Sequence, residues 1–473
     1  MKLLYFLWAL VERFGANAVS FAGNIVLAYL LSPDDFGLLA MLGVFTAVIF
    51  ALIDCGMGDA LLMHKSPSRR DFNTVFYFNV GVGVAIAVTY AALSPVVARY
   101  LGHAELQPVM VALGCGAVLT ALNIAPMTQL RSQLRFKRIA LINVGAVTLA
   151  LFLAVGVALS GGRYWALVAL QVGFPLFTGA LLLVFGHWQW RWEFDVARFK
   201  ELWRFGVNLL VSTVVTQVSQ NIFALVLGKY YNATQAGYLG QAQKLQQTPS
   251  QSLESSISIT SYVLIAKIDN PLERRAAILR MFGVMTFVNM VFCFLLLAVS
   301  EPLIACLLPA KWLPVVPYFR LMLCWGLVSP VCSHLMIIFK LHDRTAVIRN
   351  VLIVEKTAII VAAFALQSHG VVAMVGAATA LSTVSYLLYV HAAAHLMGCG
   401  AWAFHRIMLG NVALGAALGA AAWAVTLATG NAWLQLSLGT ATFAVLSLAA
   451  CRLLRPDYYH YLRNHFTPSI PES

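Results

Sequence analysis

The feature that most constrains this chain is a series of apolar stretches, each about 20 residues long, that recurs from end to end of the sequence. An α-helix of about 20 residues is long enough to cross the roughly 30 Å hydrocarbon core of a bilayer. Only 10% of the 473 residues are charged, against about 25% in an ordinary soluble domain. A soluble core could not cover this much apolar surface, so the sequence predicts an all-α polytopic membrane protein.

The apolar stretches are separated by turn residues and charged clusters, and they predict about fourteen transmembrane helices. The eighth stretch is polar, and the tenth is preceded by several prolines. We expect the helices at residues 14–31, 37–57, 73–93, 106–127, 139–159, 164–185, 205–227, 237–266, 277–299, 315–339, 346–366, 371–396, 404–427 and 433–450.

The basic residues test this count, because Lys and Arg are retained in cytoplasmic loops. If the N-terminus lies in the cytoplasm, most of the 31 Lys and Arg residues fall in loops on the cytoplasmic side. The loops on the other side hold only Arg99, Arg163, Lys229 and Lys311. This alternation predicts an even number of spans in the inner membrane, with both termini in the cytoplasm. It also accounts for the net charge of +13, so we expect no nucleic-acid partner.

A short sequence repeat indicates two related halves. Residues 13–17 read RFGAN at the start of the first predicted helix, and residues 204–208 read RFGVN at the start of the seventh. Each helix is followed by a polar turn and a glycine, in Ser32–Leu38 and in Asn232–Tyr238. Six helices separate the copies, so both enter the membrane in the same direction, as in transporters built from parallel repeats. The predicted domains are a six-helix bundle at 1–203, a second bundle at 204–398, and two further helices with a cytoplasmic tail at 399–473.

Polar side chains recur at helical spacing along the first, seventh and eighth predicted helices. Such side chains are costly in a membrane unless they face protein or an aqueous cavity. Polar contacts between packed helices also explain the first stripe, whereas Lys244 and Glu254 inside the eighth helix favour a cavity there. We therefore predict a substrate cavity, with candidate residues Arg13, Asn17, Asn24, Arg204, Asn208, Gln241, Lys244 and Gln251.

The charges in or near the helices have two interpretations each. Arg13 and Arg204 are either snorkelling anchors or a pair that binds a diphosphate, because guanidinium groups suit phosphate oxygens. Lys244 is the candidate for a deeper phosphate contact. Glu355 and Lys356 are neighbours on one helix; adjacent side chains point apart, so we expect Lys356 to pair with another helix. If transport is coupled to protons, the candidate carriers are Asp54, Glu254 and Glu355.

Three N-terminal motifs carry a resemblance to a known family. They are LLSPDDFGL at Leu30–Leu38, DCGMGDALL at Asp54–Leu62 and NTVFYFN at Asn73–Asn79. With them, the stretch Trp8–Asn79 resembles the polysaccharide transport family, of the Wzx and colanic-acid-exporter type. That family belongs to the multidrug/oligosaccharidyl-lipid/polysaccharide flippase superfamily.

The resemblance implies two six-helix lobes around a central cavity that is lined by the first, second, seventh and eighth helices. It also implies that the substrate is a sugar unit linked to undecaprenyl diphosphate. Alternating access would move this lipid from the cytoplasmic to the outer leaflet for the export of exopolysaccharide, O-antigen or capsule. The implied partners are the lipid-linked oligosaccharide, the bilayer and a polysaccharide polymerase or export machinery.

Two other functions stay open at this stage. A membrane glycosyltransferase or polymerase acting on lipid-linked sugars could use Asp34 and Asp35, but no long outer loop is predicted to hold an acceptor. The sequence has no HExxH or P-loop motif, and its eight cysteines lack metal-ligand spacing, so we expect no enzyme, metal or cofactor. A cation-coupled drug exporter of the same fold would favour carboxylates, whereas the polar stripes carry Arg13 and Lys244.

Overall fold

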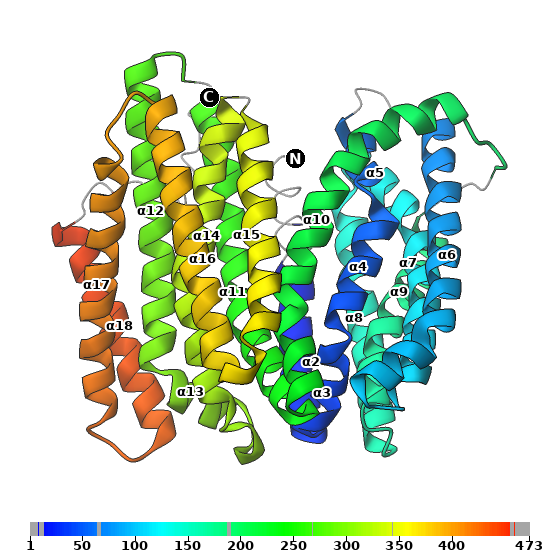
Figure 1. Cartoon of the computed structure of the whole chain (residues 1–473), viewed down its shortest axis with the longest axis horizontal. Coiled ribbons are helices and arrows are strands. Elements are labelled where there is room, and N and C mark those ends of the chain that lie inside the picture. The colour runs from blue at the N-terminus through cyan, green and yellow to red at the C-terminus, as the bar shows by residue number, and fades with distance from the viewer. Residues whose placement is uncertain are drawn as a thin grey trace. The chain divides into compact units, whose positions relative to one another are not determined.

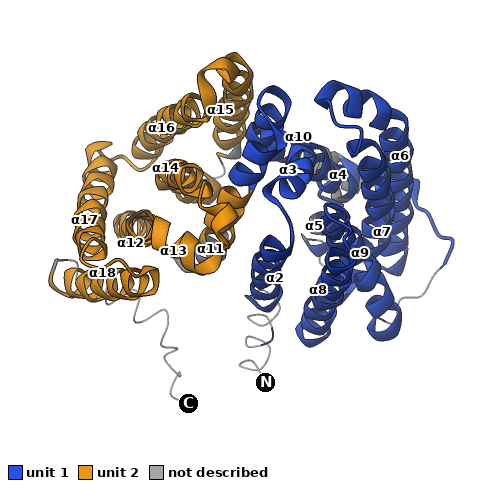
Figure 2. Ribbon diagram, turned by 90° about the horizontal axis from the view of Figure 1, so that it is seen from below, with its two compact units in different colours: residues 1–240 blue, residues 241–473 orange. Residues whose placement is uncertain are grey.

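The structure of the chain is a computed structural model that describes residues 8, 14–63, 68–186, 191–266, 268–342, 344–454 and 458. These residues are helical almost throughout and include no β-strand (Figure 1). They form two compact units, residues 1–240 and residues 241–473 (Figure 2). The predicted all-α fold is confirmed, while the predicted domain boundaries after residues 203 and 398 stay predictions.

Unit 1 contains nine helices among its described residues and the first turns of a tenth. Helix α6 packs along α7, α8 packs along α9, and α7 packs against α9 (Figure 1). Helix α2 lies on α8, and α10 packs against α3 and α4. The helices are α2 (Ala16–Leu30), α3 (Pro33–Met41), α4 (Gly43–Asp54), α5 (Met57–Met63), α6 (Arg69–Leu101), α7 (Leu106–Ser132), α8 (Phe136–Leu159), α9 (Trp165–Phe185), α10 (Val196–Tyr230) and the start of α11 (Ala233–Ala266).

Unit 2 contains the rest of α11 and seven further α-helices in the described part of the chain. Helix α12 packs against α14 and α17, and α16 packs against α14 and α15. Buried aromatic rings fill this core, and Phe282 meets Phe404 edge to face. The helices are α12 (Pro271–Ala298), α13 (Ser300–Leu307), α14 (Val315–Leu341), α15 (Thr345–Ala365), α16 (Gly370–Leu396), α17 (Trp402–Thr426) and α18 (Ala432–Leu454), with short 3-10 turns η2 (Ala310–Trp312) and η3 (Gln367–His369).

Ten helices among the described residues are long and apolar enough to cross a membrane. Helices α3 and α4 pass the same test together, with a bend of 45° between them, and they correspond to the predicted range 37–57. Every other predicted range overlaps one helix. The protein is therefore a multi-pass membrane protein, and the count of fourteen spans stays a prediction. Helices α11 and α15 are not among the ten, because polar side chains in α11 and charged side chains in α15 interrupt their apolar sequence.

A capping box sets where α3 begins. Ser32 and Asp35 form a capping box at α3: the Ser32 hydroxyl accepts from the Asp35 backbone N–H, and the Asp35 carboxylate accepts from the Ser32 N–H at 3.0 Å. Asp35 is buried and lies 3.3 Å from the Arg163 guanidinium, which comes from the turn before α9. Both aspartates of the SPDD motif begin α3, and Asp35 also links this helix to the α8–α9 turn.

Asp195 caps α10 outside the apolar part of that helix, which begins at Leu210. The backbone N–H of Arg198 lowers the pKa of the Asp195 carboxyl, as do the N–H of Ala197 and the guanidinium groups of Arg70 and Arg198. The ionised carboxylate is the form that accepts these bonds. The cap is therefore complete above the ordinary carboxyl pKa, and it weakens as the pH falls through the lowered value.

The two polar turns that the sequence repeat identified contact each other within unit 1. A Cβ atom on Gly37 would lie 1.7 Å from the carbonyl oxygen of Ala233, and one on Gly237 would lie 2.0 Å from the carbonyl oxygen of Pro33. The Thr234 hydroxyl donates to the carboxylate of Asp34 beside this contact. Because backbone meets backbone at both positions, the starts of α3 and α11 can approach this closely only with glycine there.

Candidate functional site

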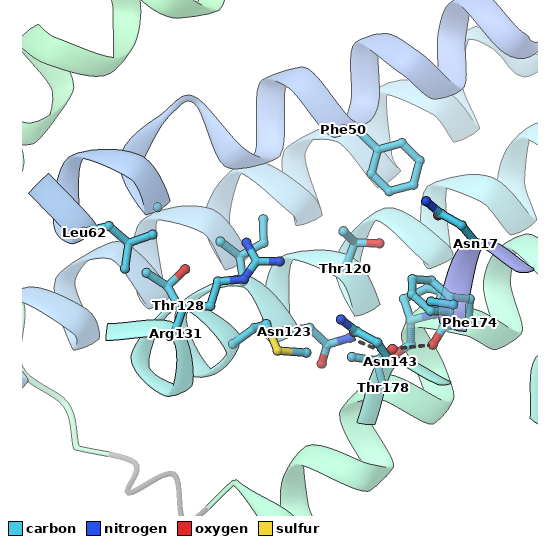
Figure 3. Close-up of a pocket in the computed structure, with 15 residues that line it drawn as sticks. Asn17, Phe50, Leu62, Thr120, Asn123, Thr128, Arg131, Asn143, Phe174 and Thr178 are labelled. Carbon is cyan, nitrogen blue, oxygen red and sulfur yellow. Dashed lines mark hydrogen bonds between the residues drawn. The ribbon is translucent and has the colours of Figure 1, made fainter. Parts of the chain in front are cut away.

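A cavity of about 700 Å³ lies in unit 1 between α2, the α4–α5 region, α7, α8 and α9 (Figure 3). Its 15 lining residues include three amides, three hydroxyls, one guanidinium, two phenyl rings and six other apolar residues. We call it the polar pocket. Its polar and aromatic lining residues are Asn17, Phe50, Thr120, Asn123, Thr128, Arg131, Asn143, Phe174 and Thr178.

A proline in α9 helps to position one wall of the polar pocket. The Asn123 side-chain amide of α7 donates to the backbone carbonyl of Pro175 in α9 at 2.7 Å. Gly179, one turn further along α9, allows this approach, because a Cβ atom there would lie 3.0 Å from the Asn123 Oδ1. Asn123 is therefore held in place by the neighbouring helix and presents a fixed side chain to the pocket.

Two threonines present acceptor oxygens to the pocket. The Thr120 hydroxyl donates to the Gly116 carbonyl at 2.9 Å. The Thr178 hydroxyl donates to the Phe174 carbonyl at 2.8 Å (Figure 3). Each hydroxyl uses its single proton inside its own helix, so its oxygen can still accept a bond from a ligand. Hydroxyl groups of a sugar are suitable donors for these positions.

Arg131 is the one charged side chain among the described residues that line the polar pocket. It lies in the last turn of α7 with an exposed side chain. In Figure 3, Arg131 and Leu62 lie toward one end of the group of lining residues, and Asn17 and Phe174 lie toward the other. A guanidinium group presents a planar set of N–H donors that matches phosphate oxygens. The pocket thus has a cationic end and a neutral end with amides and aromatic rings.

The sequence-based prediction missed Arg131 as a site residue and treated it as a loop charge. The available signal was a polar stripe that starts in the predicted fourth helix, 106–127, and continues past its predicted end, because α7 extends to Ser132. Thr120, Asn123, Thr128 and Arg131 recur at spacings that keep them near one face of α7. Most residues between these four positions are apolar, and two of the four lie beyond the predicted helix end, so the stripe was less obvious than those of the first, seventh and eighth helices.

The structure brings one predicted site residue into the polar pocket. Asn17 lines it, whereas Asn24, two turns further along α2, is half-buried and does not. In α11, Gln241 is buried and Lys244 is exposed, so these two predicted neighbours have different surroundings. Arg13 lies outside the described residues. The side chains outside the described part are those of Asp54, Arg204, Asn208, Gln251 and Glu254, and their predicted roles stay predictions.

Glu355 and Lys356 form a buried ion pair inside unit 2. The Lys356 ammonium nitrogen lies 2.9 Å from the Glu355 Oε1, and both residues are less than a tenth exposed. The same carboxylate oxygen accepts from the Ser382 hydroxyl of α16 at 2.8 Å, and Ser382 accepts from the Trp325 indole N–H of α14 at 3.1 Å. The expectation that adjacent positions keep these side chains apart was wrong, because the flexible lysine stem turns its charge back to the carboxylate.

We expect Glu355→Gln to lower the free energy of unfolding by about 3–5 kcal/mol, because it leaves the Lys356 charge buried without a counter-charge. The double variant Glu355→Gln with Lys356→Met should recover most of this loss, because it removes both charges. Unfolding of the purified protein in mixed detergent micelles of increasing SDS fraction measures the difference.

A matched control for this prediction is Glu301→Gln, which removes the exposed Glu301–Arg320 pair of 3.6 Å. An exposed pair contributes about 0–1 kcal/mol. If Glu355→Gln and Glu301→Gln lower the free energy of unfolding equally, the buried Lys356 charge does not destabilise the Glu355→Gln protein as expected.

One family model matches more than half of the chain. Residues 26–317 match the family model described as polysaccharide biosynthesis protein. The chain is 25% identical over 322 residues to the lipopolysaccharide biosynthesis protein WzxC of Escherichia coli (strain K12), covering 66% of this chain and 65% of that protein. It is 23% identical over 333 residues to the succinoglycan biosynthesis transport protein ExoT of Rhizobium meliloti (strain 1021), covering 69% and 66%. The matches thus span just under two thirds of the length of both relatives.

Among solved structures, the lipid II flippase MurJ in an inward closed conformation is similar with a TM-score of 0.73. The similarity covers 96% of this chain and 99% of that one, at 13% sequence identity. At this identity the likeness shows a shared fold.

Proposed function

The chain belongs to the polysaccharide biosynthesis protein family whose model it matches over residues 26–317, and from this membership we propose that it is a flippase for lipid-linked oligosaccharides. The family predicted from the N-terminal motifs is confirmed by this match. The proposed substrate is a sugar unit on undecaprenyl diphosphate, which alternating access moves from the cytoplasmic leaflet to the outer leaflet. The proposed partners are this lipid, the bilayer and a polysaccharide polymerase or export machinery.

The structural observation that supports the proposal is the composition of the polar pocket. Arg131 supplies a cation for a diphosphate, while Asn17, Asn123 and Asn143 supply amides that suit sugar hydroxyls. Phe50 and Phe174 add flat apolar surfaces of the kind that pack against sugar rings. A volume of about 700 Å³ is in the range of ligand pockets and leaves room for a diphosphate with a sugar.

The distribution of basic residues supports inner-membrane placement with both termini in the cytoplasm. In this topology, α7 ends and α8 begins on the cytoplasmic side. Arg131 at the end of α7 then lies close to the leaflet in which a cytoplasmic enzyme completes the lipid-linked sugar. This position suits the loading step of the proposed transport cycle.

The described contacts favour a transporter over the two other functions. Asp35 is engaged in the α3 capping box and the Arg163 ion pair, and Asp34 accepts from Thr234, so both have structural roles. This supports our expectation that the protein is not a glycosyltransferase or polymerase. The charged group among the described lining residues of the polar pocket is a cation, which suits an anionic lipid better than a cationic drug.

The test of the proposed function is movement of a fluorescent undecaprenyl-diphosphate oligosaccharide between the leaflets of reconstituted proteoliposomes. We expect protein-dependent movement of the headgroup with no change in the covalent structure of the glycan. A lengthened or transferred glycan without movement would contradict the proposal and favour an enzyme.

The same assay addresses proton coupling, for which Asp54, Glu254 and Glu355 remain the proposed carriers. Glu355 is the one of the three with a described side chain, and its ion pair with Lys356 gives its carboxylate a defined partner. Transport that continues unchanged after the proton gradient is collapsed would rule out this role for all three.

A further inference from the structure

The motif NTVFYFN at Asn73–Asn79 lies in the second and third turns of α6 and bonds to the segment that precedes α10. The Asn73 side-chain amide donates to the Glu193 carboxylate at 3.4 Å. The Thr74 hydroxyl oxygen accepts from the backbone N–H of Asp195 at 3.0 Å. Asn73 and Thr74 are both buried, so these bonds engage polar groups that would be costly to leave unpaired.

Aromatic rings of the motif pack against the same segment. The Tyr77 hydroxyl donates to the Arg191 carbonyl at 3.0 Å, and the Tyr77 ring stacks on the Trp192 indole with ring centres 5.1 Å apart. The Phe78 ring centre lies 5.0 Å from that of Phe199, in the first turn of α10. Both separations lie in the range in which aromatic rings attract each other. The motif therefore contacts the segment before α10 and the first turn of α10 itself.

Two crossed ion pairs flank these contacts. The Arg70 guanidinium of α6 lies 3.6 Å from the Asp195 carboxylate, which also caps α10. The Arg198 guanidinium of α10 lies 3.4 Å from the Asp71 carboxylate of α6. Figure 1 shows the first turns of α10 extending toward this end of α6. We call the contacts between residues 70–78 and residues 191–199 the clasp.

The other end of α10 is tied to the same helix. The Lys229 ammonium donates to the Tyr100 backbone carbonyl and lies 4.5 Å from the centre of the Tyr100 ring. A cation at this distance over an aromatic face is attracted by the ring. Lys229 lies in the last turn of α10, and Tyr100 lies in the last turn of α6. The two helices therefore run in the same direction and meet at both ends.

Between its ends, α10 packs on α3 and α4 of unit 1. A Cβ atom on Gly43 would lie 2.9 Å from the Asn221 Oδ1, so the glycine lets α4 approach α10 closely. On α10 itself, Gly228 leaves room for the Met41 side chain from the end of α3. The helix is thus held in unit 1 at its start, along its middle and at its end.

From these contacts we infer that α10 moves with unit 1 as one rigid body during transport, held by the clasp at its start and by Lys229 at its end. This inference rests on the proposed function, because it concerns a helix motion in the transport cycle. Transporters with two related halves change access largely by rigid-body motion of one part against another. The sequence repeat assigns this helix to the second bundle, from residue 204, whereas its contacts attach it to the first. The boundary between the moving parts then follows α10.

A permanent clasp is favoured over one that opens in every cycle. Opening would break the bonds of two buried polar side chains, Asn73 and Thr74, and would separate two pairs of aromatic rings. Each of these losses raises the energy of the open state. A cycle in which α10 stays attached to α6 avoids them all.

The experiment bridges α10 to α6 with a reversible cross-link and measures flipping. One full-length double variant, Asn73→Cys with Glu193→Cys, bridges the clasp, and a second, Tyr100→Cys with Lys229→Cys, bridges the other ends. Each is treated in detergent with a short bifunctional methanethiosulfonate, its bridge is confirmed by intact mass, and it is reconstituted into proteoliposomes. We expect no loss of flipping of the fluorescent undecaprenyl-diphosphate oligosaccharide relative to the same protein after reduction, because the bridged positions stay together throughout the cycle.

Two controls separate the bridge from chemical modification. Wild type treated with the bifunctional reagent reports effects on its eight native cysteines. The double variants treated with a monofunctional methanethiosulfonate carry the added groups without a bridge. If the untreated wild type moves no lipid, the proposed function fails. If the wild type moves lipid but a bridge stops flipping until it is reduced, the helices separate in the cycle and the inference alone is overturned. The two pairs test the two ends of α10 separately, so one of them suffices if the other variant does not fold.

A third variant tests the motif directly. Adding Tyr77→Ala to the Asn73→Cys and Glu193→Cys pair removes the stack on Trp192 and the bond to the Arg191 carbonyl. We expect flipping to fall by up to about tenfold without the bridge, the effect of losing one ring stack and one hydrogen bond, and to recover when the bridge forms. A residue needed only for folding would show no such recovery. A deficit that the bridge does not restore, or no deficit at all, would overturn the role of the clasp.

Discussion

Replacing Gly37 by alanine is expected to prevent stable folding of unit 1 and thereby to abolish transport. The added Cβ atom would lie 1.7 Å from the Ala233 carbonyl oxygen, far inside any van der Waals contact. The obstacle is backbone, so it cannot move aside as a flexible side chain would. Overpacking in a core usually costs about 1–3 kcal/mol, and this clash should exceed that range. Gly237→Ala should have a similar effect, because its Cβ atom would meet the Pro33 carbonyl oxygen at 2.0 Å.

The control is the same substitution at Gly81 in α6, where an added Cβ atom meets nothing within 4 Å. Alanine is a better helix former than glycine by about 0.5–1 kcal/mol, so Gly81→Ala should be neutral or mildly stabilising. Yield of folded protein, resistance to SDS unfolding and flipping in proteoliposomes measure all three variants. Gly37→Ala protein that matches Gly81→Ala in these measurements would show that α3 and α11 do not need this close approach.

Replacing Arg131 by alanine is expected to reduce flipping of the lipid-linked oligosaccharide by about 10- to 100-fold. A hydrogen bond to a charged group contributes about 1.5–3 kcal/mol, and Arg131 is the one charged group among the described lining residues of the polar pocket. Its side chain is exposed, so the fold should tolerate the change. Arg131→Lys should retain part of the activity, because it keeps the charge and loses the planar set of donors.

Arg135→Ala is the matched control for this prediction. Arg135 lies one residue before α8, is also exposed, and is not a lining residue of the polar pocket. The Arg135→Ala substitution also removes one positive charge close to the point where α7 ends and α8 begins. A general electrostatic effect on lipid capture would therefore appear in both variants. Equal activities of Arg131→Ala and Arg135→Ala in the proteoliposome assay would mean that the polar pocket does not bind the diphosphate.

The contact between Gly37 and Gly237 shows how a pattern along the chain can predict a contact in space. The repeat was recognised from RFGAN at 13–17 and RFGVN at 204–208, and from the polar turns with a glycine that follow, 200 residues apart. The structure places these turns against each other through those glycines. The sequence marks these positions because a close backbone approach of this kind permits only glycine. The contact between the two turns is shown only by the structure.

The polar residues show that the sequence predicts only part of the pocket lining. The stripe on the first helix led to Asn17, which does line the polar pocket, whereas Arg131 on the fourth helix was treated as a loop charge. Helical spacing tells which side chains share a face, but not whether that face meets lipid, a neighbouring helix or a cavity. The surroundings of the polar face of α7 depend on the hydrogen bond from Asn123 to the Pro175 carbonyl of α9. Those of Glu355 depend on the hydrogen bond that it accepts from Ser382 of α16.

The sequence by itself determined the membrane class, the helix ranges and the family, because hydropathy, charge and short motifs act locally along the chain. The tertiary structure alone decided which polar groups converge on one pocket and that Glu355 and Lys356 neutralise each other. These features depend on which helices are neighbours. Packing between segments distant in sequence decides this, for example where Gly179 of α9 leaves room for the Asn123 side chain of α7.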